Sequence, residues 1–392
     1  MINYDQVPSP CFVLEEELLE KNLEKIDYVQ KQAGVKIILA LKGFAMFSVF
    51  DTVKKYLPGI AASSLNEVLL GEKYFGVEIH TYCPAFIPSE AEEIFKKSTH
   101  VTFNSVAQFE RYAELAGKHS VSCGLRINPE YSEVKTDLYN PCIPGSRLGV
   151  RHQALQNLPQ VGNIKIEGLH FHNLCEGNSY GLENTLKSVE EKFGHLLGQI
   201  KWINFGGGHL MTHKDYNIEH LLSVLKDFKN RHPHLEVILE PGAAIAWETG
   251  VLVSRVLDII ESGGINVAIL DVSVAAHMPD CLEMPYLPNI IGATPVSVGE
   301  AAHSLPRDGV GAVPYRLGGV SCLAGDWLPE YTFDRPLAVG DPVIFKDMMH
   351  YTMVKTTHFN GVHHPSIGIW TKGGQFRPVK EFGFEEYERQ LS

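Results

Sequence analysis

The sequence lacks an excess of positive charge and a paired-cysteine framework. Its 34 Lys and Arg residues are outnumbered by 46 Asp and Glu, and the formal net charge is −12. That balance argues against a nucleic-acid-binding protein and against a protein that binds a membrane surface, whereas it suits a cationic substrate. The seven cysteines are odd in number and form no Cys-x-x-Cys motif, so a disulfide scaffold is not expected.

Long apolar runs are also missing. No stretch reaches the ~20 residues that a membrane-spanning helix needs. The first residues have neither the basic nor the apolar character of a secretory signal. Together with the cysteine usage, these features predict a cytoplasmic protein that does not enter a membrane.

What is present is an alternation of short β-rich runs and helical patterns between residues 35 and 242. Such alternation favours parallel strands joined by right-handed crossovers, and eight units are what a (β/α)₈ barrel requires. We predict this barrel over residues 15–245, with an open doubly wound sheet as the alternative. The eight candidate strands are 37–42, 59–63, 79–83, 100–104, 122–128, 167–172, 202–206 and 237–240. Helices with apolar residues at helical spacing are expected over 65–74, 89–97, 106–116, 182–197 and 218–231.

The pattern changes after Gly242, where helical periodicity fades and Gly, Pro and β-branched residues dominate. A mostly antiparallel β-domain is expected there, of the β-sandwich or β-barrel-like kind, with a first strand contributed by 10–14. This second domain would comprise residues 1–14 and 246–392. Its later strands are expected within 251–260, 267–270, 315–323, 342–345 and 367–371.

Four of the candidate barrel strands end in residues that can carry chemistry. Lys42 closes the first, His170 and His172 the sixth, the glycines 206–208 follow the seventh, and Glu240 ends the eighth. Singly, these could be a solvent-seeking lysine, half of a metal site without further ligands, a flexible turn and a surface turn residue. Together they supply a Schiff-base lysine, a flat-ring stacker, a phosphate nest and a carboxylate for a ring nitrogen. Those are the parts needed to hold pyridoxal phosphate (PLP) in one barrel mouth.

In that order, with the later Cys-containing loop, Tyr-Thr and Phe-Asn-Gly, the chain resembles the fold-type III PLP decarboxylases, a family of alanine-racemase-like barrels. Within this family, the stretches 271–273, 277–280 and 282–286 are most similar to the carboxynorspermidine and carboxyspermidine decarboxylases. The resemblance implies a PLP-dependent carboxy-lyase of polyamine biosynthesis. It also implies a homodimer with shared active sites, and the product would be norspermidine or spermidine.

The resemblance also implies roles for individual residues. Lys42 would bind PLP covalently, His172 would stack on its ring, and Glu240 would pair with the ring nitrogen. Cys322 would reach the active site of the other subunit and, unless a water does so, return a proton to the carbon that lost CO₂. The remaining cofactor contacts would be Arg126, which braces the site, and the phosphate ligands Gly206, Gly207, Gly208, Gly242 and Tyr351.

Three positions depart from the family pattern. Cys175 lies where a phosphate-site serine is usual, Ala243 replaces an arginine, and Leu323 replaces the acidic residue of the ornithine-type enzymes. The last change argues against ornithine or diaminopimelate as substrate. A substrate arm with two amines would need carboxylates, since buried ammonium groups require charged partners. The candidate substrate-binding carboxylates are Glu240, Asp280, Glu283 and Asp326.

Other functions remain open at this point. The nearest is another fold-type III enzyme, either an amino-acid racemase or a decarboxylase of diaminopimelate, lysine or ornithine. A non-catalytic relative would be expected to have lost Lys42 or Cys322, and both are present. A metal-dependent barrel hydrolase would need ligands beyond His170 and His172, and we predict no metal.

Overall fold

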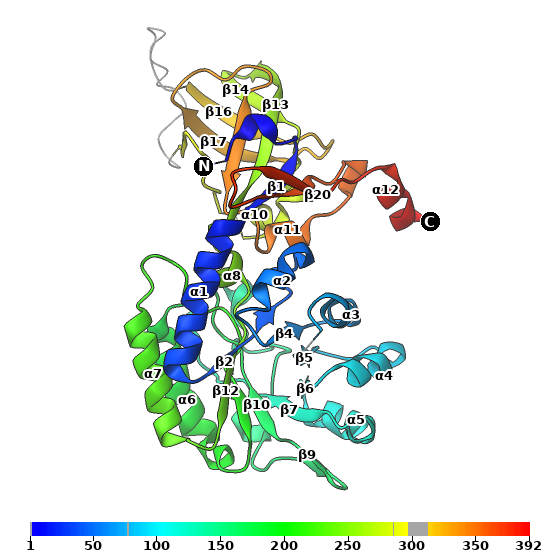
Figure 1. Cartoon of the computed structure of the whole chain (residues 1–392), viewed down its shortest axis with the longest axis vertical. Coiled ribbons are helices and arrows are strands. Elements are labelled where there is room, and N and C mark those ends of the chain that lie inside the picture. The colour runs from blue at the N-terminus through cyan, green and yellow to red at the C-terminus, as the bar shows by residue number, and fades with distance from the viewer. Residues whose placement is uncertain (1, 77, 285, 297–312) are drawn as a thin grey trace. The chain divides into compact units, whose positions relative to one another are not determined.

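The computed structural model describes residues 2–76, 78–284, 286–296 and 313–392, so Pro285 of the 282–286 motif lies outside the described residues. The chain forms two compact units. One consists of Glu20–Ile245, and the other combines Met1–Leu19 with Ala246–Ser392 (Figure 1).

The first unit is built on a parallel sheet that closes on itself. Its strand order is β2-β12-β11-β10-β7-β6-β5-β4-β3. The first predicted strand is broken into β2 (Lys36–Ile37), which pairs with β12, and β3 (Leu39–Ala40), which pairs with β4. At the break, the N–H of Ile38 still donates to the carbonyl of Leu239. The predicted eight-stranded barrel is therefore confirmed, with its first strand in two pieces. The other strands are β4 (Gly59–Ala62), β5 (Glu78–Tyr82), β6 (His100–Phe103), β7 (Ser122–Arg126), β10 (Gly168–His170), β11 (Trp202–Asn204) and β12 (Glu236–Leu239).

Helices follow most of these strands and surround the sheet (Figure 1). In α7 the residues at helical spacing, Leu221, Leu225 and Phe228, are buried, as its amphipathic pattern predicts. Polar N-caps begin several helices, and Ser64 and Ser105 each accept a bond from the N–H three residues later. The helices are α1 (Glu16–Ala33), α2 (Phe50–Val53), α3 (Leu65–Tyr74), α4 (Pro88–Lys97), α5 (Val106–Lys118), α6 (Ser179–Leu197), α7 (Ile218–Arg231) and α8 (Ala243–Ala246), and a small hairpin is formed by β8 (Gln160–Val161) and β9 (Ile164–Lys165).

The barrel interior is filled around Trp202. Its indole packs with Ile38 and Ile238, and its N–H donates to the hydroxyl of Ser122 at 2.9 Å. A Cβ built at Gly168 or Gly124 would overlap the indole ring. The two glycines on neighbouring strands therefore make room for one large side chain inside the barrel.

The second unit contains a nine-stranded sheet ordered β15-β17-β16-β14-β13-β1-β19-β20, with β18 paired to β13. Pairing is antiparallel except for β1 with β19 and β14 with β16, so the predicted mostly antiparallel character is confirmed. Its strands are β1 (Cys11–Glu15), β13 (Gly250–Ser262), β14 (Ile265–Leu270), β15 (Ala293–Pro295), β16 (Val313–Gly318), β17 (Trp327–Phe333), β18 (Pro342–Lys346), β19 (Ser366–Trp370) and β20 (Phe376–Lys380).

Four helices that the sequence analysis did not anticipate lie in the second unit. Three of them span only four or five residues, which is too short for an apolar periodicity to be recognised. They are α9 (Val274–His277), α10 (Pro279–Glu283), α11 (Thr352–Lys355) and the longer α12 (Phe384–Leu391).

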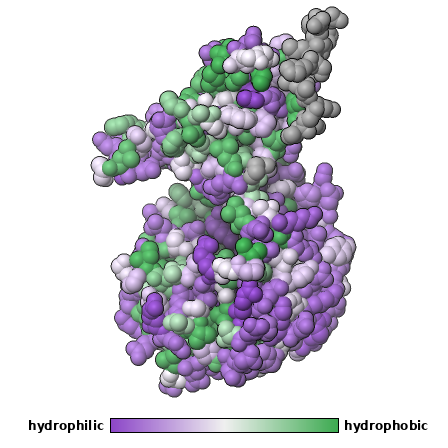
Figure 2. Space-filling view, turned by 180° about the vertical axis from the view of Figure 1, so that it is seen from behind, coloured by the Kyte–Doolittle hydropathy of each residue, from purple (hydrophilic) through white to green (hydrophobic). Residues whose placement is uncertain are grey.

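The described part of the chain has no helix with the length and apolar character that crossing a bilayer requires. On the barrel unit, the face seen in Figure 2 is mostly hydrophilic, with hydrophobic side chains in small groups. Scattered apolar residues of this kind are usual on folded proteins and mark no site by themselves.

The packing of Trp202 generates a stability prediction. Gly168→Ala should lower the free energy of unfolding by about 1–3 kcal/mol, because the new methyl group overlaps the buried indole. Gly194→Ala in α6 is the matched control, since its Cβ would meet nothing within 4 Å. It should raise stability by about 0.5–1 kcal/mol through better helix propensity. Urea denaturation of the two variants measures both effects, and equal behaviour of the pair would contradict this account of the barrel interior.

Candidate active site

Four predicted site residues lie at the carboxyl ends of barrel strands. Lys42 follows β3, Arg126 ends β7, His172 lies just beyond β10, and Glu240 follows β12. In a parallel barrel these ends meet at one mouth, where such folds hold their active sites. The Lys42 amine lies 3.2 Å from Nε2 of His172. The barrel therefore places an amine directly beside an imidazole.

The other nitrogen of His172 determines how the ring is protonated. The N–H of Gly207 donates to Nδ1 at 2.9 Å, so Nδ1 carries no proton and the neutral ring has its proton on Nε2. Burial, together with the charges of Lys42 and Arg126, holds the pKa of His172 well below its usual range. His172 is therefore a neutral imidazole whose Nε2–H faces the lysine.

Lys42 follows β3 in the barrel unit. Its side chain is accessible to solvent, although protein atoms surround it densely. Burial and the Arg126 guanidinium lower the pKa of the amine, which increases the fraction of its neutral, nucleophilic form. A neutral amine can accept the hydrogen bond from Nε2–H of His172, so the two groups are compatible in protonation.

Glu240 lies at the same mouth and is held as a carboxylate. The amide nitrogen of Asn204 donates to its Oε1 at 2.6 Å, and Nε2 of His170 lies 3.6 Å from Oε2, beyond hydrogen-bonding range. Burial alone would raise the pKa of Glu240, but His170, His80 and the Asn204 amide outweigh it and lower the pKa to about 2. Sequence reasoning missed Asn204, although a polar residue at the end of an apolar strand was the available signal.

Arg126 is buried, with 4% of its surface exposed. Its Nη2 donates to the carbonyl of His172 at 3.0 Å, and its guanidinium lies 4.6 Å from the ring centroid of Tyr82. The Tyr82 hydroxyl in turn donates to Asn104 at 2.8 Å. The arginine thus fixes the backbone that carries His172 and supplies the positive charge that acts on Lys42.

The glycine turn after β11, residues 206–208, has a backbone conformation that would be strained for residues with a side chain. Gly206 and Gly208 have φ values of 69° and 84°, in the left-handed region that glycine adopts without penalty. A Cβ at Gly207 would overlap the carbonyl oxygen of Glu240. Two of the three N–H groups are engaged, because Gly206 donates to Asn204 and Gly207 donates to His172. Phosphate binding by this turn stays a prediction.

Gly242, the fourth predicted phosphate contact, lies against Gly43. A Cβ at Gly43 would come within 2.8 Å of the Gly242 Cα, so the turns that follow β3 and β12 approach each other through backbone atoms. The sequence analysis did not single out Gly43, although it directly follows Lys42. The close approach holds the lysine turn next to the turn that carries Glu240.

In the second unit, Asp280 is the predicted carboxylate with an open position. It is 7% exposed and lies on α10. Its Oδ2 accepts hydrogen bonds from the hydroxyls of Tyr286 and Thr352, at 2.6 and 2.8 Å. Its Oδ1 is buried and has no hydrogen-bond partner among the described residues. A buried carboxylate oxygen without a partner is expected to be completed by a ligand or a water.

Asp326 and Cys322 belong to one loop that follows β16. Both oxygens of Asp326 are used within the second unit: the N–H and hydroxyl of Ser321 donate to Oδ2, and the N–H of Ala275 donates to Oδ1. Asp326 therefore anchors the loop. The exposed Cys322 follows Ser321 and is held by its N–H, which donates to Asn360 at 2.7 Å.

The other two predicted residues of this unit have distinct settings. Glu283, also on α10, forms an ion pair with Lys355. Tyr351 has φ 43° and ψ −56° at the centre of a three-residue turn closed by a bond from Thr352 N–H to the His350 carbonyl. Such a turn is strained for a residue with a side chain, and strain of this kind concentrates at functional positions.

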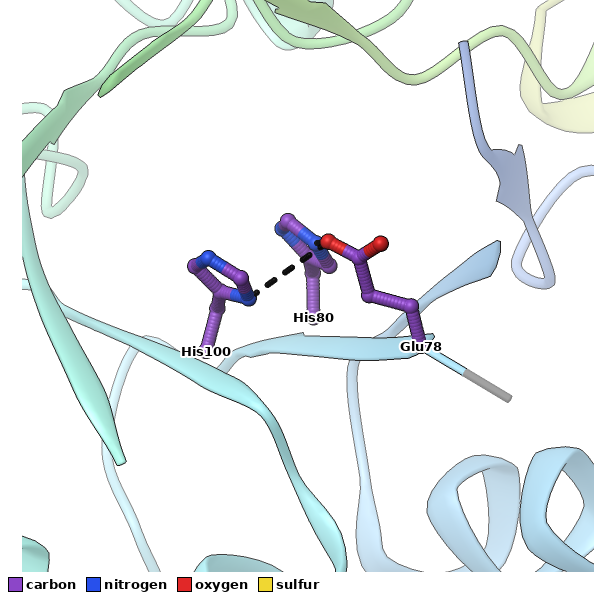
Figure 3. Close-up of side chains that lie close together, drawn as sticks. All are labelled: Glu78, His80 and His100. Atoms are coloured by element: carbon purple, nitrogen blue, oxygen red, sulfur yellow. Dashed lines mark hydrogen bonds and ion pairs between the residues drawn. The ribbon is translucent and has the colours of Figure 1, made fainter. Parts of the chain in front are cut away.

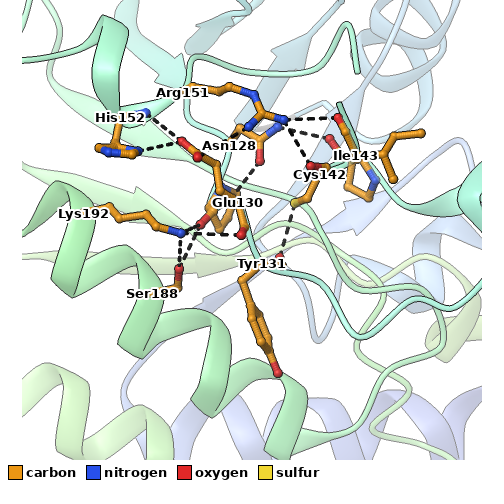
Figure 4. A network of polar contacts seen from close by, with 11 residues as sticks. Asn128, Glu130, Tyr131, Cys142, Ile143, Arg151, His152, Ser188 and Lys192 are labelled. Atoms are coloured by element: carbon orange, nitrogen blue, oxygen red, sulfur yellow. Dashed lines mark hydrogen bonds and ion pairs between the residues drawn. The ribbon is translucent and has the colours of Figure 1, made fainter. Parts of the chain in front are cut away.

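The long segment after β7 is held by polar contacts shown in Figure 4. Glu130 accepts from the N–H and Nδ1 of His152, at 3.1 and 2.8 Å. Lys192, on α6, donates to the carbonyl of Pro129 and to the Ser188 hydroxyl. These bonds tie the residues that follow Arg126 to a barrel helix.

A separate polar cluster is formed by side chains of β5 and β6 (Figure 3): Glu78 and His100 are the first residues of their strands, and His80 is the third residue of β5. Glu78, His80 and His100 place three metal-ligand-type atoms within 4.8 Å of one another. However, the Glu78 oxygen that lies 2.7 Å from Nε2 of His80 also accepts a hydrogen bond from Lys36 at 2.8 Å. The two histidine rings are stacked at 3.9 Å and 12°, so their in-plane lone pairs do not converge on one point. We interpret this cluster as an ion pair network inside the fold.

The barrel mouth fits PLP in its chemistry. An accessible amine with a lowered pKa suits the aldehyde carbon, and a stable carboxylate at Glu240 suits the pyridine nitrogen. The neutral ring of His172 can lie against a flat heterocycle. Lys42, Glu240, His172 and the glycine turn are the residues that would hold the cofactor.

Comparisons with known proteins agree with this fit. Residues 20–247 match the family model described as pyridoxal-dependent decarboxylase, pyridoxal binding domain. A carboxyaminopropylagmatine decarboxylase from Synechocystis is 51% identical over 98% of this chain and 96% of its own. A carboxynorspermidine/carboxyspermidine decarboxylase from Campylobacter jejuni is 42% identical over 98% of both chains.

The solved structures extend the likeness to three dimensions. The crystal structure of carboxynorspermidine decarboxylase from Campylobacter jejuni, complexed with norspermidine, superimposes with a TM-score of 0.88 at 41% identity and covers 98% of this chain and 100% of that one. The fold, the donor set at the barrel mouth and these matches lead to one conclusion. The chain belongs to the pyridoxal-dependent decarboxylase family and uses PLP as its cofactor.

Proposed function

We propose that this protein removes the α-carboxylate of a carboxylated polyamine, carboxynorspermidine or carboxyspermidine, and so forms norspermidine or spermidine. The observation that carries the substrate class is the likeness over 98% of the chain to decarboxylases whose names all specify a carboxylated amine. The net charge of −12 is in keeping with a cationic substrate. A place in polyamine biosynthesis and in the cytoplasm belongs to the same proposal.

Bound PLP supplies an acceptor for the electrons released when the carboxylate leaves the substrate. The protein's own groups would orient the reaction and control protons. Lys42 would hold the cofactor through its amine, and Glu240 would keep the ring nitrogen protonated because its own pKa is about 2. His172 would support the ring face, and Arg126 would keep the His172 backbone in place.

Asp280 is the best-supported carboxylate for a substrate amine. A buried Oδ1 without a partner among the described residues can accept a hydrogen bond from one charged N–H donor, and such a bond contributes about 1.5–3 kcal/mol. Asp326 is less suited because its loop uses both oxygens, and Glu283 would first have to release Lys355. Substrate specificity would therefore depend on Asp280 with Tyr286 and Thr352.

A second substrate is favoured by a specific finding. The relative at 51% identity is named for carboxyaminopropylagmatine, and agmatine ends in a guanidinium group. A guanidinium prefers two carboxylate oxygens side by side, whereas Oδ2 of Asp280 already accepts two hydrogen bonds. The free Oδ1 suits a single ammonium N–H better. The sequence identity thus favours carboxyaminopropylagmatine as the substrate, whereas the geometry at Asp280 favours carboxynorspermidine or carboxyspermidine. Measured kcat/KM values distinguish the two assignments.

The proton returned after CO₂ loss would come from the thiol of Cys322 or from a water. We place Cys322 in the active site of a second copy of the chain, so that the functional unit is a homodimer with shared sites. The exposed position of Cys322, flanked by the exposed apolar residues Val320 and Leu323, suits a surface that another chain covers.

The first test concerns Glu240. Glu240→Gln should lower kcat on the order of 100-fold, because a neutral amide cannot keep the ring nitrogen protonated. PLP should still bind, since the amide retains the shape of the carboxylate. Glu236→Gln, at the opposite end of the same strand, is the control and should leave kcat unchanged. Near-normal turnover of Glu240→Gln would show that Glu240 is only a turn residue.

The second test compares substrates. We expect kcat/KM for carboxynorspermidine or carboxyspermidine to exceed that for ornithine, lysine or diaminopimelate by at least about 100-fold, since the shorter substrates leave Oδ1 of Asp280 unpaired. The two carboxylated polyamines differ by one methylene and should differ by only about 10–200-fold. Carboxyaminopropylagmatine belongs in the same panel. If it is the preferred substrate, the second assignment replaces the first, and racemisation without CO₂ release would refute both.

The third test concerns the shared site. Lys42→Ala and Cys322→Ala homodimers should each be nearly inactive, with Lys42→Ala the more severe. Mixing them equally with free subunit exchange should restore about a quarter of wild-type sites, because each heterodimer has one intact site. Exchange is verified separately with differently tagged subunits. A mixture that exchanges but stays inactive would mean that Cys322 acts within its own chain or not at all.

A further inference from the structure

Asn204 is a buried polar residue to which sequence reasoning assigned no role. It is the last residue of β11, is 2% exposed, and lies between the strands that precede His172 and Glu240. A buried amide at such a position needs partners for both of its ends. Its two partners turn out to be two different parts of the candidate active site.

The amide of Asn204 is oriented by the chemistry on each side. Its nitrogen donates to Oε1 of Glu240 at 2.6 Å, and its oxygen accepts the N–H of Gly206 at 2.8 Å. Exchanging the two ends would put an oxygen against a carboxylate and an NH₂ against an N–H. The orientation of Asn204 is therefore unambiguous, and a single planar group connects Glu240 to the glycine turn.

The hydrogen bond from Asn204 has no counterpart from another described side chain at the Glu240 carboxylate. Among the described residues, Asn204 is the one side chain within hydrogen-bond distance of the Glu240 carboxylate, since His170 lies 3.6 Å away. A hydrogen bond to a charged group is stronger than one between neutral groups, and more so out of water. An aspartate at 204 could still accept from Gly206, but it would lose the donor and face Glu240 as a like charge.

We propose that Asn204 is a positioning residue that holds the Glu240 carboxylate and the 206–208 turn in one geometry, and thereby couples the ring-nitrogen end of the cofactor site to its phosphate end. The inference rests on the role proposed above for Glu240. Asn204 itself touches neither end of the cofactor in this account. It acts through Glu240 and Gly206.

The same local motif occurs elsewhere in the barrel without the carboxylate. Asn128, after β7, is also buried, and its oxygen accepts the N–H two residues later, from Glu130 at 2.9 Å. Its nitrogen donates to the carbonyl of Pro141 at 3.2 Å. Asn128 therefore serves as a comparison, because it is an asparagine near a strand end whose side chain, among the described residues, hydrogen-bonds only to backbone groups. What distinguishes Asn204 is its partner, Glu240.

The experiment measures PLP binding to the apoprotein as a function of pH, without substrate. In Asn204→Asp, two carboxylates face each other and hold one proton between them at lower pH. PLP affinity should be near wild type at about pH 6 and fall about tenfold or more by about pH 9, when both ionise and repel. Wild type and the matched control Asn128→Asp should lack this added pH dependence.

Asn204→Ser provides a second variant that adds no charge. Its hydroxyl can still accept from Gly206, but the donor to Glu240 is lost. PLP affinity should fall about tenfold at all pH values, and circular dichroism checks that the variant is folded. The proposal is overturned if Asn204→Asp titrates like wild type, if Asn128→Asp shows the same new dependence, or if folded Asn204→Ser binds PLP normally. Because no substrate is present, a wrong substrate assignment leaves these outcomes unaffected.

Discussion

The first strand of the barrel hydrogen-bonds on both sides, through β2 to β12 and through β3 to β4. This closure brings the two sequence extremes of the sheet together, so that Lys42 from the first strand and Glu240 from the last share one mouth. The direct backbone approach of Gly43 and Gly242 is possible only because both lack a side chain. An open sheet would leave these two turns at opposite edges, and no single site could contain both residues.

Within this mouth, each charge state is explained by its neighbours. Arg126 helps to lower the pKa values of Lys42 and His172, which favours a neutral amine beside a neutral imidazole. Glu240 is kept anionic by His170, His80 and Asn204 despite burial. The same mouth therefore holds an amine whose pKa is lowered and a carboxylate that stays ionised. Pre-arranged protonation of this kind is what a cofactor that reacts through its aldehyde and its ring nitrogen requires.

In the second unit, two aspartates that the sequence analysis proposed for the same role, binding a substrate amine, differ in their hydrogen-bond partners. Both oxygens of Asp326 accept hydrogen bonds, from Ser321 and Ala275, whereas Asp280 has one buried oxygen without a partner among the described residues. Both are buried, so exposure alone does not separate them. The difference lies in whether nearby N–H and O–H donors satisfy both oxygens. An aspartate with an open oxygen is the better ligand for a substrate cation.

Much of the barrel was determined by the sequence alone. The helices Leu65–Tyr74 and Ile218–Arg231 agree with their predicted bounds, because apolar periodicity is a short-range property of the chain. Lys42, His172 and Glu240 could be selected as candidates because strand ends in a barrel share one face. Only the tertiary structure decided three other features. These are the break of the first strand at Ile38, the hydrogen bond from Asn204 to Glu240, and the hydrogen bonds that occupy both oxygens of Asp326. Each depends on which distant atoms the strand register and loop packing bring within a few ångströms, and no local pattern in the sequence encodes that distance.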